Sequence, residues 1–252
     1  MKCIILAAGY ATRLYPLTEN FPKPLLDVGG KTILDHLIDD LESKDYIDEY
    51  FVVTNHKFAN IFRDWAKDKS KIKIIDDGTN SNDNRFGALK DLKYALGIID
   101  NYEDVLVIAG DNLLDFSLND FIEYAKNKGT SAVMTYEIDD VDKLKRTGVL
   151  ELDNDNRVID MEEKPAFPKS NFACPPFYYY IGKDIGLLEE ALYAGCNSDA
   201  PGSFVSWLCS RTDIYAYLMP GNRYDIGNLE SYEEVKRIYK GVNNESKRRI
   251  KK

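Results

Sequence analysis

The sequence feature that most constrains the fold of this chain is an alternation of short apolar runs with segments of helical periodicity. The runs are rich in Ile, Val and aromatic residues and predict strands at residues 2–8, 50–55, 71–76, 104–110 and 130–136. Between them, apolar residues recur at helical spacing within residues 33–41, 58–65 and 86–96. The first and fourth runs are apolar on both faces, which is typical of central strands in a mostly parallel sheet. The alternation predicts βαβ units and a Rossmann-like α/β fold.

The second half of the chain is more mixed and predicts small β-hairpin insertions. Residues 148–152 and 158–163 flank an Asn-Asp-Asn turn, which favours a hairpin. Further strands are predicted at residues 177–181 and 214–219, and further helices at residues 203–209 and 229–239. Because no repeat, linker or change of composition divides the chain, we predict a single domain over residues 1–242, followed by a basic, disordered tail at residues 243–252.

The composition excludes several classes of function. With 44% hydrophobic and 30% charged residues, the chain has the make-up of a folded soluble protein. A formal net charge of −9 argues against a nucleic-acid partner, which needs clustered Lys and Arg, although a local basic cleft for a small anion remains compatible with it. No segment has the length and apolarity of a membrane span, and the apolar N-terminus soon meets charged residues, so we expect a cytoplasmic protein with no membrane partner.

Cysteine and histidine usage argues against several kinds of site. The four cysteines, at positions 3, 174, 196 and 209, lie far apart and have no metal-ligand spacing. Two disulfides remain open, but free buried thiols are the favoured interpretation for a cytoplasmic chain. The only histidines are His36 and His56, which disfavours a histidine-based metal site or a Ser-His-Asp triad.

Small residues directly after the first predicted strand indicate a phosphate-binding loop, because small side chains let backbone N–H groups approach phosphate oxygens. Arg13 and Lys23 add positive charge, and Lys23 is held between two prolines. The alternative is a plain turn with solvated charges, but the combination of features favours nucleotide binding. The candidate residues are Leu6, Ala8, Gly9, Tyr10, Ala11 and Thr12, with Arg13 and Lys23 as catalytic cations.

Residues 9–25 resemble the signature of the sugar-1-phosphate nucleotidyltransferases, G-x-G-T-R-L-x-P-L-T-x-x-x-P-K-P-L. These are NDP-sugar pyrophosphorylases of the glucose-1-phosphate thymidylyltransferase type. The resemblance implies a GT-A-like three-layer sandwich around a mostly parallel central sheet. The second glycine of the signature is Ala11 here, and because alanine adopts a positive φ less readily, we expect a local difference in the loop.

Two aspartates match the metal-binding positions of that family. Asp111 follows Gly110 at the end of an apolar run, where open α/β sheets bind ligands. Asp225 lies in an Arg-Tyr-Asp-Ile-Gly-Asn segment that resembles the family's W-x-D-x-G-T element, with Arg223 and Asn228 replacing Trp and Thr. The resemblance implies that Asp111 and Asp225 hold Mg²⁺, which prefers carboxylate and phosphate oxygens. Gly110 joins the nucleotide-binding candidates. The alternatives are an ordinary turn at Asp111 and a helix cap near Asn228.

Further matches concern the acceptor and the base. The Glu-Glu-Lys-Pro segment resembles the family's acceptor site, which implies that Lys164 holds the acceptor's phosphate and Glu163 its sugar, with Gly148 in a sugar-contact turn. For the base, the predicted contacts are Asn80, Asn84 and Gly87; the amides could equally only cap a polar loop. The aromatic run at residues 177–180 is expected to pack in the core.

These residues together predict an enzyme that transfers NMP from an NTP to a sugar 1-phosphate, with Mg²⁺ as cofactor. The base, the acceptor and the oligomeric state stay open; a homo-oligomer is compatible with the sequence. The main alternative is a cytidylyltransferase acting on phosphocholine or a phosphonate, for which the aromatic run could supply cation–π contacts. A glycosyltransferase is disfavoured because no Asp-x-Asp ends a strand. A catalytically silent subunit is disfavoured because every charged position of the motifs is present.

Overall fold

The computed structural model describes residues 1–99 and 103–242. The chain forms two compact units. Unit 1 comprises Met1–Ile4, Phe86–Ile108 and Phe121–Met219, and unit 2 comprises Ile5–Arg85, Ala109–Asp120 and the segment that begins at Pro220. The single domain over residues 1–242 stays a prediction, and the basic tail at residues 243–252 lies outside the described residues.

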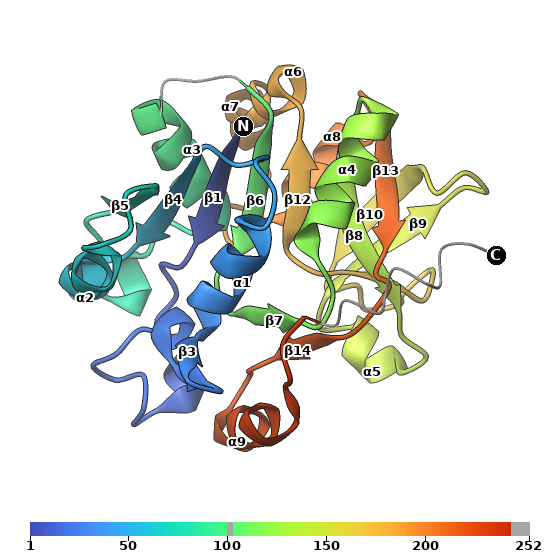
Figure 1. The fold of residues 1–252 in the computed structure, drawn as a ribbon. Coiled ribbons are helices and arrows are strands. Elements are labelled where there is room, and N and C mark those ends of the chain that lie inside the picture. Colours follow the sequence, from blue (N-terminus) through green and yellow to red (C-terminus); the bar gives the residue numbers. More distant parts are fainter. Residues whose placement is uncertain (100–102, 243–252) are drawn as a thin grey trace. The chain divides into compact units, whose positions relative to one another are not determined.

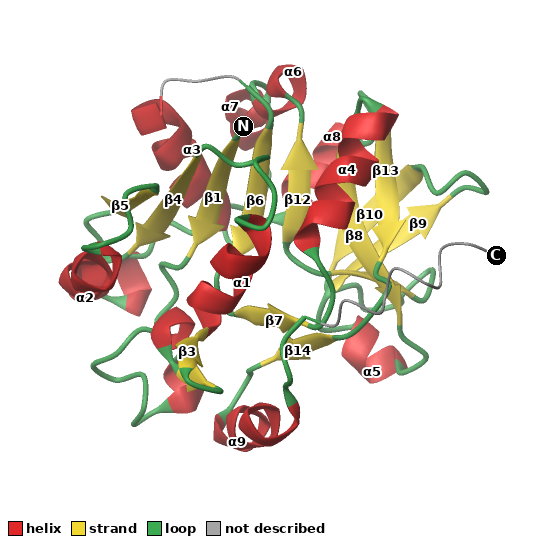
Figure 2. Cartoon of the chain, viewed as in Figure 1, coloured by secondary structure: helices red, strands yellow, loops and turns green. Residues whose placement is uncertain are grey.

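In unit 2 a βαβ arrangement positions the loop that follows the first strand. The strand order is β1-β4-β5, and β4 (Glu49–Thr54) runs parallel to β5 (Ile72–Asp76). The helix α2 (His56–Ala66) connects these strands and lies against both (Figure 2). Its N-cap is Asn55, whose side chain accepts a hydrogen bond from the Phe58 amide and donates one to the Ala8 carbonyl at 2.9 Å. One buried side chain thus starts the helix and fixes the end of the β1 (Lys2–Leu6) segment.

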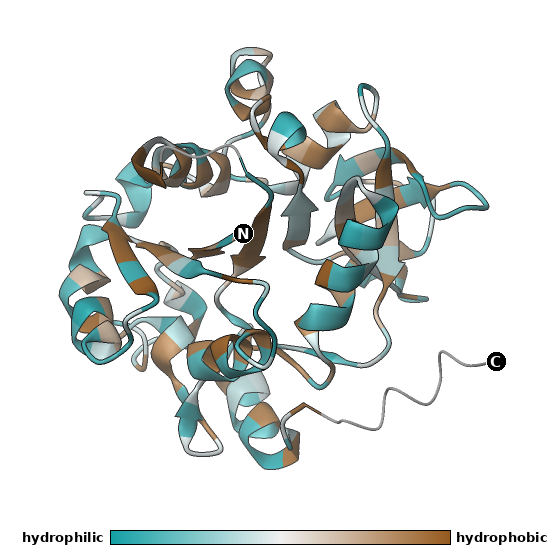
Figure 3. Ribbon diagram, turned by 45° about the horizontal axis from the view of Figure 1, so that its top comes forward, coloured by the Kyte–Doolittle hydropathy of each residue, from teal (hydrophilic) through white to brown (hydrophobic). Residues whose placement is uncertain are grey.

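The helix α1 (Ile33–Leu41) forms where the apolar spacing predicts it. Thr32 and Asp35 make a capping box at its start, and its apolar residues at helical spacing are buried. Along the helices of the chain, brown and teal stretches alternate in Figure 3, as expected of amphipathic helices that bury one face. The short strands β2 (Asp27–Val28) and β3 (Lys31–Thr32) pair antiparallel just before α1.

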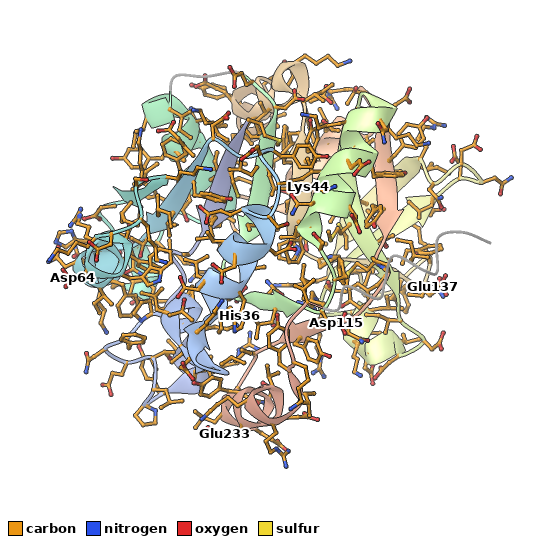
Figure 4. The ribbon with its side chains drawn as sticks, viewed as in Figure 1. His36, Lys44, Asp64, Asp115, Glu137 and Glu233 are labelled. Atoms are coloured by element: carbon orange, nitrogen blue, oxygen red, sulfur yellow. The ribbon has the colours of Figure 1, made fainter. Side chains whose placement is uncertain are left out.

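A two-stranded sheet and the last described helix complete unit 2. The strands β7 (Asn112–Leu114) and β14 (Arg223–Asp225) pair antiparallel and lie side by side in Figure 1. The helix α9 (Leu229–Ile238) begins at a capping box made by Asn228 and Ser231. After α9, Tyr239 donates a hydrogen bond to the Leu114 carbonyl at 3.0 Å. Asp115, labelled in Figure 4, accepts two hydrogen bonds from Asn222 and so fixes the approach to β14.

Unit 1 contains most of the antiparallel pairings. Its strand order is β10-β9-β11-β8-β12-β6-β1, and β13 runs parallel to β8. The strands are β6 (Val105–Ala109), β8 (Ser131–Glu137), β9 (Gly148–Leu152), β10 (Val158–Glu163), β11 (Phe172–Cys174), β12 (Phe177–Tyr180) and β13 (Ile214–Leu218). The helices are α3 (Ala88–Ile99), most of α4 (Leu118–Lys128), α5 (Val141–Leu144), α6 (Gly182–Ile185), α7 (Leu188–Tyr193) and α8 (Gly202–Leu208). The predicted β9–β10 hairpin is present.

The aromatic run on β12 belongs to the core of unit 1. All four residues from Phe177 to Tyr180 are buried, and the rings of Tyr178 and Tyr180 stack at 5.8 Å. Tyr179 donates a 2.6 Å hydrogen bond to Asp104. Core packing is therefore the correct interpretation, and these rings offer no exposed aromatic surface.

Two sequence-based expectations about thiols and membranes can be compared with the structure. All four cysteines are free, as expected, but only Cys3 and Cys174 are buried. Cys196 and Cys209 are partly exposed, so the expectation of burial is wrong for them. In the described part of the chain, no helix combines the length and apolarity that crossing a membrane requires.

Candidate functional site

A cavity of about 390 Å³ in unit 2 gathers both predicted catalytic cations, both predicted metal ligands and four of the predicted nucleotide-binding residues. Its volume falls in the range of small-ligand sites. The predicted residues that line it are Leu6, Gly9, Ala11, Thr12, Arg13, Lys23, Asp111 and Asp225. It is also lined by residues that were not among the predicted site residues, namely Ala7, Leu14, Pro24, Ala109, Ile226 and Gly227.

The loop after β1 takes a turn that a glycine would normally make. Ala11 has φ 48° and ψ 41°, in the left-handed region, which costs an L-residue roughly 1–2 kcal/mol. Its carbonyl accepts hydrogen bonds from the Thr18 hydroxyl at 2.8 Å and from the Leu14 amide at 2.9 Å. Thr18 is fully buried, so this pair of bonds holds the strained residue in place. The alanine therefore keeps a positive φ and does not avoid it.

Gly9 lies exposed on the same loop and lines the cavity. A Cβ built on Gly9 would have no neighbour within 4 Å. Packing within the chain therefore does not require a glycine there. The open space over its backbone is instead available to a ligand, which is the use of small residues expected in a phosphate-binding loop.

The two candidate cations differ in their surroundings. Arg13, on the short helix η1 (Thr12–Leu14), is exposed at the cavity. Lys23, on η2 (Lys23–Leu25), is only 8% exposed, and its Nζ lies 2.8 Å from Asp111 Oδ2. A buried ammonium needs such a partner, because burying an unpaired charge is costly. Arg13 is thus presented to solvent, whereas Lys23 is held in a fixed position.

The β7–β14 pairing brings the two candidate metal ligands to one cavity. Asp225 is the register partner of Asn112, the neighbour of Asp111 in sequence. Both aspartates line the cavity, although 114 positions separate them in the sequence. No group of three or more His, Cys, Asp or Glu side chains suited to a metal occurs among residues 1–99 and 103–242. Two carboxylates fit Mg²⁺, which commonly takes one or two and completes its shell with phosphate oxygens and water.

A continuous set of polar contacts links these aspartates. Asp111 Oδ1 accepts a 2.8 Å hydrogen bond from Asn112 Nδ2, and Asn112 Oδ1 accepts one of 2.6 Å from Arg223 Nη1. Arg223 Nη1 also lies 3.9 Å from Asp225 Oδ1. With the Lys23 ion pair, both oxygens of Asp111 have protein partners. In the sequence, Arg223 stands out only as a departure from the family pattern, and Asn112 has no predicted role.

Three predicted nucleotide-binding residues support the loop and do not line the cavity. The Ala8 carbonyl accepts a hydrogen bond from the side-chain amide of Asn55, and the Tyr10 hydroxyl donates one to the Thr79 carbonyl at 3.3 Å. The Gly110 amide donates to the Leu6 carbonyl at 3.0 Å, and a Cβ on Gly110 would lie 3.0 Å from Ile5 Cγ2. Close packing against Ile5 therefore favours glycine at position 110 independently of any contact with a nucleotide.

The predicted base-contacting residues make local hydrogen bonds. Asn84 Oδ1 accepts hydrogen bonds from the backbone amides of Ser81 and Asn80, at 3.0 and 3.3 Å. Asn80 Nδ2 donates to the Gly78 carbonyl at 3.3 Å. These side chains therefore cap the loop of unit 2, and their contact with a base stays a prediction. Gly87 belongs to unit 1, has φ 86°, and a Cβ there would lie 2.5 Å from Asp199 Oδ1, so backbone and packing both require glycine.

The predicted acceptor residues lie on neighbouring strands of unit 1. Gly148 on β9 is the register partner of Glu163 on β10, and Lys164 follows with φ 49° and an exposed side chain. Glu163 Oε1 accepts a 2.8 Å hydrogen bond from the Gly202 amide at the start of α8. Burial raises the pKa of the Glu163 carboxyl, while this hydrogen bond acts in the opposite direction. The Pro201-Gly202 pair before a predicted helix was the available signal for this contact.

Comparisons with known proteins identify the family of the chain. Residues 2–241 match a family model described as nucleotidyl transferase. Among curated relatives, the bifunctional protein GlmU of Methanocaldococcus jannaschii is 34% identical over 190 residues, which are 75% of this chain and 42% of that protein. The glucose-1-phosphate adenylyltransferase of Fervidobacterium nodosum is 27% identical over 246 residues, which cover 92% of this chain and 59% of that protein. The chain spans about half the length of these relatives.

Solved structures share the fold. A crystal structure assigned as a glucose-1-phosphate thymidylyltransferase of Bacillus anthracis, in complex with sucrose, has a TM-score of 0.81 and 24% identity, covering 96% of each chain. A UDP-glucose pyrophosphorylase with bound UDP-glucose has a TM-score of 0.78 and 21% identity, covering 94% of this chain and 97% of that one. These similarities confirm the predicted fold class.

Proposed function

Because the chain belongs to the nucleotidyl transferase family, we propose that it transfers a nucleoside monophosphate from an NTP to a sugar 1-phosphate, forming an NDP-sugar and pyrophosphate. The observation that carries the proposal is the cavity of unit 2, where a small-residue loop, two cations and two aspartates meet. The names of the relatives and neighbours quoted above, which specify sugar phosphates or nucleotide-sugars, support this choice of acceptor.

The transfer depends on positioning and charge neutralisation more than on a protein nucleophile. An oxygen of the acceptor's phosphate attacks the α-phosphorus in line, and pyrophosphate leaves. Arg13 steadies the departing pyrophosphate, and its exposed position at the cavity suits that role. Lys23 neutralises the α-phosphate. Because an ammonium has three donors, Lys23 can bind a phosphate oxygen while it keeps Asp111 as a partner.

Asp111 and Asp225 would hold Mg²⁺, which when bound neutralises the charge of the NTP phosphates. Each of these aspartates has a cationic neighbour in the chain, Lys23 at 2.8 Å for Asp111 and Arg223 at 3.9 Å for Asp225. Their negative charges are therefore partly compensated before any cation binds, which lets two carboxylates border one cavity.

In unit 1, Lys164 holds the acceptor's phosphate and Glu163 contacts its sugar hydroxyls. The positive φ of Lys164 and the hydrogen bond from Gly202 to Glu163 fix the two residues at the end of β10. The alternative acceptor, phosphocholine, relied on exposed aromatic rings, and the residues of β12 are buried. A sugar phosphate is therefore the preferred acceptor. Assembly into a homo-oligomer stays a prediction.

The deciding experiment is a pyrophosphate-release screen of the common NTPs against sugar 1-phosphates, phosphocholine and a phosphonate, with Mg²⁺ present. We expect turnover with a sugar 1-phosphate. Turnover only with phosphocholine or the phosphonate would replace the proposed acceptor, and turnover with no pair would contradict the proposed function.

The aspartate variant Asp111→Asn tests the proposed metal ligand. We expect its pyrophosphate release to fall by at least about 100-fold, since it removes a carboxylate that would hold the Mg²⁺ that neutralises the NTP phosphates. The melting temperature should fall only modestly, because the asparagine oxygen can still accept a hydrogen bond from Lys23 although the ion pair is lost. The matched control is Asp64→Asn on α2, a residue outside the cavity, labelled in Figure 4. Full activity of Asp111→Asn would refute the assignment.

A further inference from the structure

Asn112 stands between a cation and an anion in the core of unit 2. Its side chain is almost completely buried, with 1% of the residue exposed. It donates to Asp111 Oδ1 at 2.8 Å and accepts from Arg223 Nη1 at 2.6 Å. Both contacts involve a charged group, and such hydrogen bonds are stronger than those between neutral groups.

The chemistry of the three side chains permits one orientation of this amide. The Arg223 guanidinium can only donate, and an ionised Asp111 carboxylate can only accept. The oxygen of Asn112 must therefore face Arg223, and its nitrogen must face Asp111. Reversing the amide would oppose donor to donor and acceptor to acceptor. Arg223 thereby selects the orientation of Asn112 that holds Asp111.

Asp111 is in turn held at both oxygens, by Asn112 on Oδ1 and by Lys23 on Oδ2. A carboxylate fixed at both ends has a defined plane, and its remaining lone pairs point in fixed directions. Without Arg223, the buried oxygen of Asn112 would lose its charged donor, and Asn112 would hold Oδ1 of Asp111 less firmly. Arg223 and Asp225 are two residues apart on β14, so their side chains lie on the same face of the strand. The pairing with β7 brings this strand next to Asn112.

We propose that Arg223 is a positioning residue, which acts through Asn112 to set the plane of the Asp111 carboxylate. It touches neither the acceptor nor the reacting phosphates in this role. The inference rests on the proposed function for its catalytic consequence only. The orientation of Asp111 is a property of the chain itself and can be measured separately.

The competing interpretation is that Arg223 only stabilises the β7–β14 pair. A purely structural role would lower the melting temperature of a variant and leave the affinity for a divalent cation unchanged in the folded fraction. A positioning role changes the cation affinity and kcat while the fold is kept. Loss of a residue that orients a metal ligand typically lowers metal affinity 10–100-fold.

The test compares Arg223→Gln and Arg223→Lys with the parent chain, with Arg63→Gln as control. Arg63 is a half-exposed arginine of unit 2, paired with Asp76 at 3.5 Å and outside the cavity. Binding of Mn²⁺ alone is followed by electron paramagnetic resonance, and kcat and KM are measured with the substrates selected by the screen. Crystal structures of the parent chain and of Arg223→Gln give the orientation of Asp111 and its distance from Asn112.

We expect Arg223→Gln to bind Mn²⁺ at least 10-fold more weakly and to lose kcat more than KM, with Asp111 rotated away from Asn112. Arg223→Lys, which keeps one donor, should recover part of the loss, and Arg63→Gln should match the parent. Parental Mn²⁺ affinity in Arg223→Gln would overturn the proposal. If Arg223→Gln does not fold, Arg223→Lys decides by the same measurements. If the parent releases no pyrophosphate or shows no Mn²⁺ binding, the orientation of Asp111 decides: an unmoved carboxylate overturns the inference.

Discussion

In unit 2 the charged candidate residues line an open cavity, whereas in unit 1 Glu163 is half-buried against the Gly202 amide and its neighbours are tightly packed. The first arrangement leaves room over Gly9, where a Cβ would meet nothing within 4 Å. The second leaves none at Gly202, where a Cβ would collide with Met161 and Glu163. The predicted nucleotide-binding residues thus surround an open cavity with charged groups. Among the predicted acceptor residues, Gly148 and Glu163 instead lie in close packing.

The largest expected effect is on catalysis in unit 2. Lys23→Met should lower pyrophosphate release by about 100- to 1000-fold, the range observed when one donor to a developing charge is removed. It also leaves Asp111 without its ammonium partner. Steady-state kinetics provide the measurement, and Lys31→Met, which removes an exposed lysine paired with Asp39, is the control. A loss below 10-fold would show that Lys23 serves Asp111 alone.

The next effect concerns stability in unit 1. Gly202→Ala places a methyl group into Met161 and Glu163, so we expect a loss of about 1–3 kcal/mol in the free energy of unfolding. Gly9→Ala, in open space, should change that free energy by less than about 0.5 kcal/mol while impairing activity. Chemical denaturation of both variants tests the comparison. Equal losses in stability would show that packing does not distinguish the two units.

A smaller effect is the dependence of the free energy of unfolding on pH through Glu163. The pKa of Glu163 is raised in the folded chain, chiefly by burial, so its protonated form favours folding and its ionised form opposes it. The contribution is present at acid pH and is lost as the pH rises through the folded pKa. Glu163→Gln keeps an oxygen for the Gly202 amide and removes the ionisation, so it should raise the free energy of unfolding at pH 7.

The same difference should shrink as the pH falls below about 4.3, the usual pKa of a glutamate in an unfolded chain. Thermal melts of both proteins across this range provide the measurement. A difference that does not change with pH would mean that the ionisation of Glu163 does not couple to folding.

The smallest effect is at Ala11. Ala11→Gly removes the cost of a left-handed alanine, roughly 1–2 kcal/mol, but gives the unfolded chain more freedom, worth roughly 0.4–1 kcal/mol. We expect a net stabilisation of about 0.5 kcal/mol in denaturant unfolding, with activity unchanged. Destabilisation would mean that the methyl group, which packs against the hydrophobic core of unit 2, contributes more than the backbone costs.

Much of this arrangement could be predicted from the sequence, because the signals were local. The apolar runs gave β1, β4, β5 and β6, and periodicity gave α1, α2 and α3. The strands β7 and β14 were not predicted, because three residues each are too few to show an alternating pattern. That unpredicted pair is what brings Asp225 to Asp111, a proximity that only the family resemblance had implied.

Roles that depend on packing were also beyond the sequence. Asn112 has no recognisable motif, and the Pro201-Gly202 pair signals a turn before a helix but not the partner of Gly202. The partners of Asn112 and Gly202 lie 111 and 39 positions away in the sequence. Gly87 attracted attention as a candidate ligand contact, yet its positive φ and the closeness of Asp199 already require a glycine. Residues 80–84 likewise form a capping box through Ser81 and Asn84. Polar side chains in the sequence could therefore not distinguish a base-binding loop from a capped turn.

The buried Asn112 amide has a consequence for how this protein can vary. The Asn112 amide accepts a hydrogen bond from Arg223 and donates one to Asp111. Substitutions at positions 112 and 223 are therefore expected to depend on each other. An aspartate at 112 would place two acids side by side, and an apolar residue at 223 would leave the buried Asn112 oxygen without its donor. A library that randomises both positions together should therefore yield functional sequences as matched pairs, and one that randomises either alone should return mostly the parent residue.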